Sequence, residues 1–106
     1  MLKITKQELS KHSTLNPEND LYVCIKKTIF NVSKNREMYN SAYANFTGKD
    51  ASRALAKSVT ELSECNDDLE GLNNEQLKVL DGISILILDW FSFYEKKYEK
   101  VGVLID

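Results

Sequence analysis

Residues 21–32, LYVCIKKTIFNV, contain two short runs of β-branched and aromatic side chains. Such side chains favour strands, so Leu21–Ile25 and Thr28–Val32 are predicted to be β-strands. Because only Lys26 and Lys27 separate the runs, the two strands are predicted to form an antiparallel hairpin. Two-residue hairpin turns need positive φ, which lysine adopts reluctantly, so the sequence leaves the turn type open.

A short helix is predicted before the hairpin. Residues Thr5–Glu8 have the Thr-x-x-Glu pattern of a capping box, in which each side chain bonds a backbone N–H group of the other residue. Ile4 and Leu9 flank this pattern and can form a hydrophobic staple. The polar segment Asn16–Asp20 contains the single proline and is predicted to be a loop.

Two short helices are predicted after the hairpin. Ser33–Met38 begins with a serine, which can cap a short helical turn. Asp50 is a suitable N-cap for a helix through Ala51–Ala56, where most residues favour helix. The segment between these helices has no clear periodicity and is predicted to be irregular.

The C-terminal part is predicted to be one long helix. Apolar residues spaced three and four apart continue from about Asn74 to Tyr98, which indicates a broad apolar helix face. Gly102 is predicted to end this helix, and Val103–Ile105 to add an edge strand. The predicted fold class is therefore α+β, a small sheet with short helices and one long C-terminal helix.

Composition restricts the class of protein. The 106 residues are 42% hydrophobic and 28% charged, which suits one globular domain over residues 1–106. A formal net charge of −2 gives no electrostatic reason to expect nucleic acid as a partner. The most apolar run, Ile83–Phe93, is interrupted by polar residues and is shorter than the roughly 20 residues of a transmembrane helix. We therefore expect a soluble protein without a transmembrane segment in this chain.

Nucleophiles and metal ligands are few. The single histidine, His12, excludes a two-histidine haem site, and it is expected at the surface near the end of the first helix. Cys24 lies in an apolar run and is predicted to be buried, whereas Cys65 lies among polar residues and is predicted near the surface. The carboxylates of Asp67 and Asp68 lie in a polar acidic segment, which is a poor setting for acid–base catalysis. These features predict a protein that is not an enzyme.

Tyrosine is the chemically distinctive residue type. The chain has five, at positions 22, 39, 43, 94 and 98. On composition alone, most are expected to be packing residues whose hydroxyl has found a partner. Tyr39 and Tyr43 differ because they lie in the irregular segment, and binding residues are often found in such segments.

Several motifs resemble one family over nearly the whole chain. They are IFNVSK at 29–34, FTGKDASRALA at 46–56, ITKQEL at 4–9 and FSFY at 91–94, followed by Lys97-Tyr98. Together they resemble the membrane-associated progesterone receptor family, a divergent branch of the cytochrome b5-like haem-binding domains. The resemblance implies a cytochrome b5-like fold.

The resemblance also implies a site. Tyr43 matches the tyrosine whose phenolate binds the iron of ferric haem b, and Tyr39 matches a second tyrosine of the pocket. Lys97 matches a lysine suited to a haem propionate, and Tyr98 a tyrosine suited to hydrogen-bonding the iron-bound phenolate. Here only residues 40–42 separate the first two tyrosines, whereas the family has a longer segment rich in glycine and proline.

The function that the resemblance implies is non-catalytic haem binding. Such a protein would regulate or supply haem proteins of sterol or lipid metabolism, haem-containing monooxygenases among them. It would form a haem-dependent homodimer and reside inside the cell, in the cytoplasm or peripheral to the endoplasmic reticulum membrane. Two alternatives stay open: an electron carrier of the cytochrome b5 type, and a haem-free interaction module that has lost the site.

Overall fold

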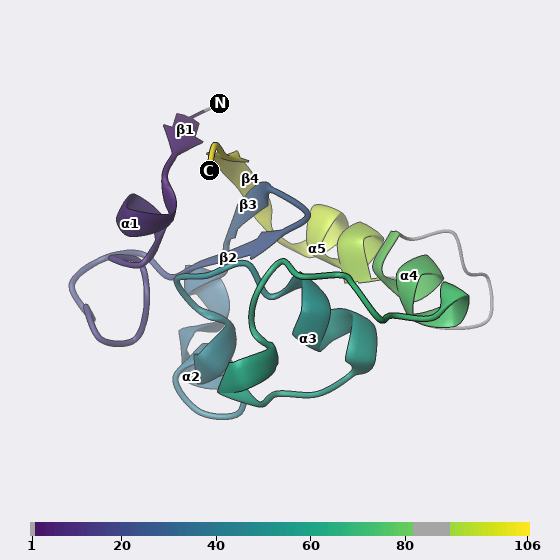
Figure 1. Ribbon diagram of the computed structural model, residues 1–106. Helices are drawn as coiled ribbons and strands as arrows, with labels where there is room; N and C mark the ends of the chain where they lie inside the picture. The colour runs from purple at the N-terminus through teal and green to yellow at the C-terminus, as the bar shows by residue number, and fades with distance from the viewer. Residues whose placement is uncertain (1, 82–89) are drawn as a thin grey trace.

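The computed structural model describes residues 2–81 and 90–106 (Figure 1). Its strands are β1 Leu2–Ile4, β2 Tyr22–Ile25, β3 Thr28–Asn31 and β4 Glu99–Leu104. Its α-helices are α1 Lys6–Leu9, α2 Arg36–Tyr39, α3 Ser52–Lys57, α4 Asn74–Asp81 and α5 Trp90–Lys97. Three single-turn 3-10 helices are η1 Ser33–Asn35, η2 Ala44–Phe46 and η3 Leu62–Glu64. The short helices and small sheet confirm the predicted α+β class.

The sheet is mixed and has the order β1-β4-β3-β2. The hairpin of β2 and β3 is antiparallel, as predicted, and pairs Tyr22 with Asn31 and Ile25 with Thr28. Strand β4 lies antiparallel to β3 and parallel to β1, so the two ends of the chain meet at the sheet. The sheet therefore joins four strands from both ends and the middle of the sequence.

The hairpin turn is of the primed kind despite its two lysines. Lys26 has a φ of 48° and Lys27 a φ of 71°, the signs of a type I′ turn. The strained backbone is held by tertiary contacts: the backbone N–H of Lys26 donates to Ser52 Oγ at 2.8 Å, and Lys27 Nζ donates to Asp67 Oδ2 at 2.9 Å. These partners lie far away in sequence, so the local pattern could not identify the turn.

The predicted capping box begins α1. Glu8 donates its backbone N–H to Thr5 Oγ1 at 3.1 Å, and Thr5 donates its own to Glu8 Oε1 at 3.2 Å. The flanking residues Ile4 and Leu9 are buried in one apolar cluster, which confirms the staple. At α3, the helix begins at Ser52, and the Asp50 carboxylate accepts the Ser52 N–H at 2.9 Å.

Alternating side chains of the hairpin divide the core into two clusters. Tyr22 and Cys24 of β2 enter the cluster that includes α1 and β1. Val23 and Ile25 enter the other, with residues of α2, α3 and α5. Figure 1 shows α2 and α3 together below the hairpin, with α1 away from them. The second cluster contains the buried tyrosines and is the one that forms the candidate site.

The prediction of a C-terminal edge strand was wrong. Strand β4 spans Glu99–Leu104 and lies inside the sheet, between β1 and β3. Gly102 belongs to this strand and does not end a helix. A Cβ on Gly102 would come within 2.5 Å of the Leu2 carbonyl oxygen, so glycine allows β1 to approach. The partner strand, at the opposite end of the chain, gave no signal in the local sequence.

The prediction of one long helix from about Asn74 to Tyr98 was also wrong. Helices α4 and α5 pack against each other, which two successive stretches of one straight helix cannot do at a rise of 1.5 Å per residue. The rest of the predicted helix lies outside the described residues. Spacing by three and four recurs in any amphipathic helix, so it does not distinguish one helix from two that share a core.

Both cysteines are buried free thiols. Cys24 was predicted to be buried and is, whereas the prediction for Cys65 was wrong, because only 7% of that residue is exposed. Its thiol donates to the Glu61 carbonyl at 3.4 Å within the η3 turn, which folds the polar segment over the side chain. Among the described residues, no helix is long and apolar enough to cross a membrane.

Two glycines with positive φ give a matched test of the fold. Gly48 has a φ of +74°, and a Cβ there would lie 2.7 Å from Ser13 Cβ, whereas Gly71 has a φ of +85° and open space. We expect Gly71→Ala to cost about 1–2 kcal/mol through backbone strain alone. Gly48→Ala should cost about 1–3 kcal/mol more because Ser13 must move. Urea unfolding measures both, and equal losses would contradict this packing.

Candidate functional site

The candidate site is an aromatic cavity beside the helical face of the sheet, called here the tyrosine cavity. Its volume is about 150 Å³. All four residues singled out from the sequence lie around it, together with five that were not: Tyr39, Tyr43, Lys97 and Tyr98, and Met38, Phe46, Leu55, Phe93 and Tyr94.

Two segments bring the tyrosines together. Tyr39 is the last residue of α2, and Tyr43 directly precedes η2. On the other wall, Tyr94 lies one turn before the end of α5, and Tyr98 follows its last residue. The Tyr98 backbone N–H donates to the Tyr94 carbonyl at 2.8 Å, which continues the helical geometry and places both rings on one face.

Buried hydroxyls link the two walls. The Tyr39 and Tyr94 hydroxyl oxygens are 2.6 Å apart, and each residue is only 2% exposed. Asn35 Nδ2 donates to the Tyr98 hydroxyl at 2.7 Å, and Tyr98 is 5% exposed. Among the described residues, no buried side-chain nitrogen or oxygen lacks a hydrogen-bond partner. The network therefore orients these rings with their polar ends satisfied.

Burial makes two of the tyrosines harder to ionise than a free tyrosine. It raises the pKa of Tyr39 well above the usual value near 10, and the neighbouring Tyr94 adds to the effect. Burial likewise raises the pKa of Tyr94, although the hydrogen bond from Tyr39 opposes the shift. Both side chains are thus neutral phenols at ordinary pH, suited to hydrogen bonding and unsuited to acting as an anionic metal ligand.

Tyr43 has a different environment. It is half-buried, and its ring stacks on that of Phe46 with centroids 5.4 Å apart and planes 7° apart. It also lies against Tyr39, with ring centroids separated by 5.7 Å. Within residues 2–81 and 90–106, no side chain hydrogen-bonds the Tyr43 hydroxyl. The stack fixes the ring, and its oxygen is not occupied by any side chain of the described residues.

Lys97 supplies a positive charge at the edge of the tyrosine cavity. Its Nζ lies over the Phe93 ring at 5.3 Å and over the Tyr98 ring at 5.8 Å from the centroids. The residue is exposed, so the ammonium group borders both solvent and the aromatic lining. A charge in this position suits a ligand with an apolar body and an anionic edge.

Sequence reasoning missed Tyr94 and Asn35. Tyr94 lies within the predicted C-terminal helix, where a tyrosine is expected to be a packing residue. Its spacing of four residues before Tyr98 was the available signal, because residues at that spacing share a helix face. Asn35 gave no such signal, since its contact with Tyr98 joins η1 to the far end of the chain.

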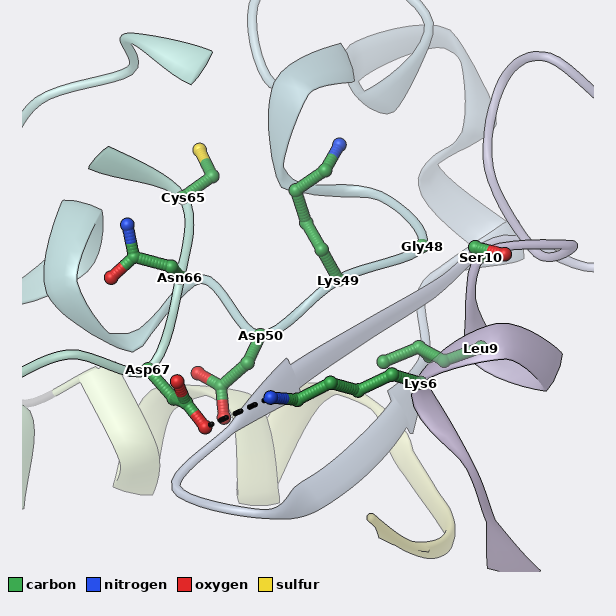
Figure 2. A pocket seen from close by; sticks show the side chains of 9 residues that line it. All are labelled: Lys6, Leu9, Ser10, Gly48, Lys49, Asp50, Cys65, Asn66 and Asp67. Carbon is green, nitrogen blue, oxygen red and sulfur yellow. Dashed lines mark ion pairs between the residues drawn. The ribbon is translucent and has the colours of Figure 1, made fainter. Parts of the chain in front are cut away.

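A second hollow of about 330 Å³ lies between α1, the Gly48–Asp50 segment and the Cys65–Asp67 segment (Figure 2). Lys6 reaches across it to Asp67, with 3.8 Å between Nζ and Oδ2. Burial raises the pKa of the Cys65 thiol, which makes it a weak nucleophile. This hollow is larger than the tyrosine cavity, but its ion pair and weak thiol supply no group poised for chemistry.

His12 lies away from the tyrosine cavity. Its ring stacks on Tyr22, whose side chain is in the other apolar cluster, with centroids 4.0 Å apart. The His12 Nδ1 lies 3.0 Å from the Asp20 carbonyl oxygen. Histidine therefore contributes nothing to the tyrosine cavity, and tyrosine oxygen is the metal-binding chemistry available there.

The residues of the tyrosine cavity fit ferric haem chemically. Tyrosinate is an established type of haem ligand, and Tyr43 offers such an oxygen beside neutral hydroxyls and a cation. The volume of about 150 Å³ is below the 300–1,000 Å³ of typical ligand pockets, so the walls must separate to admit a group of that size.

Comparison with known protein families gives a match over residues 5–104. The matching family is described as Cytochrome b5-like Heme/Steroid binding domain. A solved Arabidopsis thaliana structure, described as having a cytochrome b5 like fold, is 31% identical and superimposes with a TM-score of 0.82. The match covers 100% of this chain and 93% of the other.

Curated relatives cover the chain but differ in length. Membrane steroid-binding protein 2 of Oryza sativa is 39% identical over 96% of this chain and 37% of its own length. Probable steroid-binding protein 3 of Arabidopsis thaliana is 32% identical, over 98% of this chain and 99% of its own. Cytochrome P450 regulator dap1 of Schizosaccharomyces pombe is 33% identical, over 95% of this chain and 61% of its own length. The chain thus spans well under half of the first relative and nearly all of the second.

The hydroxyl pair of Tyr39 and Tyr94 can be tested by a double-mutant cycle. Each single change, Tyr39→Phe or Tyr94→Phe, should cost about 1–2 kcal/mol of unfolding free energy, because it leaves the other buried hydroxyl without that partner. The double variant should lose less than the sum of the two. Tyr43→Phe is the control and should change stability little. Additive losses in denaturant unfolding would show that the hydroxyls do not interact.

Proposed function

The chain belongs to the cytochrome b5-like haem/steroid-binding domain family, in its membrane-associated progesterone receptor branch, and we propose that it binds ferric haem through Tyr43 as a non-catalytic regulator of haem proteins. One observation carries the proposal. The four residues expected from the sequence, from two distant segments, line a single cavity. Tyr43 is the one among them with a half-buried ring fixed by stacking and a hydroxyl that no described side chain hydrogen-bonds.

Each residue has a distinct proposed role. Tyr43, as its phenolate, would hold the iron. Tyr39 stays protonated and can donate a hydrogen bond within the pocket, held in place by Tyr94. Lys97 would pair with a propionate at the rim, and Tyr98, oriented by Asn35, would hydrogen-bond the Tyr43 oxygen in the haem-bound protein. An anionic oxygen ligand favours ferric over ferrous iron, which suits haem sensing or transfer better than electron exchange.

A regulatory role is supported by one of the relatives. The fission-yeast relative is named as a cytochrome P450 regulator. We therefore take haem-containing monooxygenases of sterol or lipid metabolism as the proposed partners, and the endoplasmic reticulum membrane surface as the place where they meet. The electron-carrier alternative needs two axial histidines of the ordinary kind, and the chain has only His12, which lies elsewhere.

Ferric haem titration tests the proposal. The unaltered protein should show saturable one-to-one binding and a ferric spectrum with a phenolate charge-transfer band. Tyr43→Phe should abolish that band and weaken binding at least tenfold, because the iron loses its anionic ligand. Absorption spectra of the two proteins across the titration measure both effects.

Tyr22→Phe is the matched control for this titration. Tyr22 is a tyrosine of the opposite apolar cluster, so its loss should leave the haem spectrum unchanged. If Tyr43→Phe binds haem with an unaltered spectrum, the ligand is another residue. If the unaltered protein shows no saturable binding, the haem-free interaction module is the correct reading.

Haem loading should also change the oligomeric state. A haem held by Tyr43 as its single protein ligand would leave apolar haem surface uncovered, and exposed apolar surface favours association. We expect a monomer without haem and a dimer with it in sedimentation velocity. Identical sedimentation of the two forms would remove the homodimer from the proposal without affecting haem binding.

A further inference from the structure

A groove of about 490 Å³ borders Met38, as the tyrosine cavity does. It is lined by Lys34, Asn35, Glu37, Met38, Ser41 and Ala42. Met38 is the one residue that lines both this groove and the tyrosine cavity. It is 45% exposed, and methionine is unbranched with three rotatable side-chain bonds. Met38 is therefore a flexible side chain at the junction of the two spaces.

Two lysines, one from the lining of each space, lie over the same aromatic ring, that of Tyr98. Lys34 Nζ lies over the Tyr98 ring at 5.3 Å, and Lys97 Nζ over it at 5.8 Å from the centroid. Lys34 comes from η1 and Lys97 from α5, so the two charges come from different walls. In the part of the chain that the structure describes, neither ammonium forms an ion pair with a carboxylate.

We infer that the groove and the tyrosine cavity are two halves of one ligand cleft divided by Met38, in which Lys34 and Lys97 each bind one carboxylate of a flat apolar dicarboxylate ligand. The groove alone falls within the usual volume range of ligand pockets, which the tyrosine cavity does not reach. This inference rests on the proposed function, because ferric haem is the dicarboxylate that the Tyr43 oxygen would select. It adds Lys34 and Met38 to the binding residues.

The charge of Glu37 offers a second test, because its removal should change ligand affinity in the direction opposite to removal of the Lys34 charge. Glu37 lines the groove together with Lys34, and its negative charge would repel an anionic ligand there. Removing the Lys34 charge should weaken binding of a dicarboxylate, and removing the Glu37 charge should strengthen it. Neither change should affect a ligand of the same shape without charge.

The experiment compares ferric haem with its dimethyl ester, in which both carboxylates are neutral. Lys34→Gln and Lys97→Gln should each weaken haem binding about threefold to fivefold, the range for exposed ion pairs, and leave ester binding unchanged. Glu37→Gln should strengthen haem binding by up to about threefold. Lys96→Gln, an exposed lysine of the same helix as Lys97, is the control and should bind both compounds like the unaltered protein.

Association rates test the role of Met38. Met38→Ala should bind haem several times faster in stopped flow, and Met38→Phe several times slower, because the first change opens the junction and the second fills it.

The inference is overturned if Lys34→Gln leaves the ratio of haem to ester affinity unchanged while haem still binds. If the unaltered protein binds the ester through Tyr43 as tightly as it binds haem, haem binding through Tyr43 is supported, and the proposed carboxylate sites at Lys34 and Lys97 are wrong. If neither haem nor the ester binds, both the proposed function and the proposed carboxylate sites are wrong.

Discussion

The contact between Phe30 of β3 and Tyr94 of α5 connects the sheet to the candidate site. Their ring centroids are 5.6 Å apart, and Phe30 is fully buried. Tyr94 in turn holds the Tyr39 hydroxyl, and Tyr39 packs against Tyr43. The position of the proposed ligand therefore depends on a series of ring contacts that begins in the central strands. Because aromatic rings are rigid, such a series transmits the geometry of the sheet to the tyrosine cavity.

Burial explains how tyrosines of one cavity can have different roles. Tyr39 and Tyr94 are almost inaccessible, which raises the pKa of both and keeps them neutral. Tyr43 is half-buried and stacks on Phe46 with its hydroxyl unclaimed by any side chain of the described residues. The Lys97 ammonium, over the Phe93 and Tyr98 rings, adds a positive charge at the edge of the tyrosine cavity. A site of this kind depends on uneven solvent access across a few ångströms, which residue type alone does not specify.

Several features were readable from local sequence because neighbouring residues create them. The capping box at Thr5–Glu8, the two strands of the hairpin and the burial of Cys24 all follow from patterns of fewer than ten residues. Contacts between distant segments were not readable in this way. The left-handed turn at Lys26-Lys27 is held by Ser52 and Asp67, and Cys65 is buried because η3 folds over it.

The sequence by itself determined the family and the α+β class, because these are properties of motifs and local patterns, and its resemblance to the family singled out Tyr39, Tyr43, Lys97 and Tyr98 as candidates. Only the tertiary structure decided that β4 lies inside the sheet, that α4 and α5 are separate helices in contact, and that Tyr94 and Asn35 orient the candidate site. The physical reason is that strand order and hydroxyl pairing join residues up to a hundred positions apart, through contacts that leave no periodic trace along the chain.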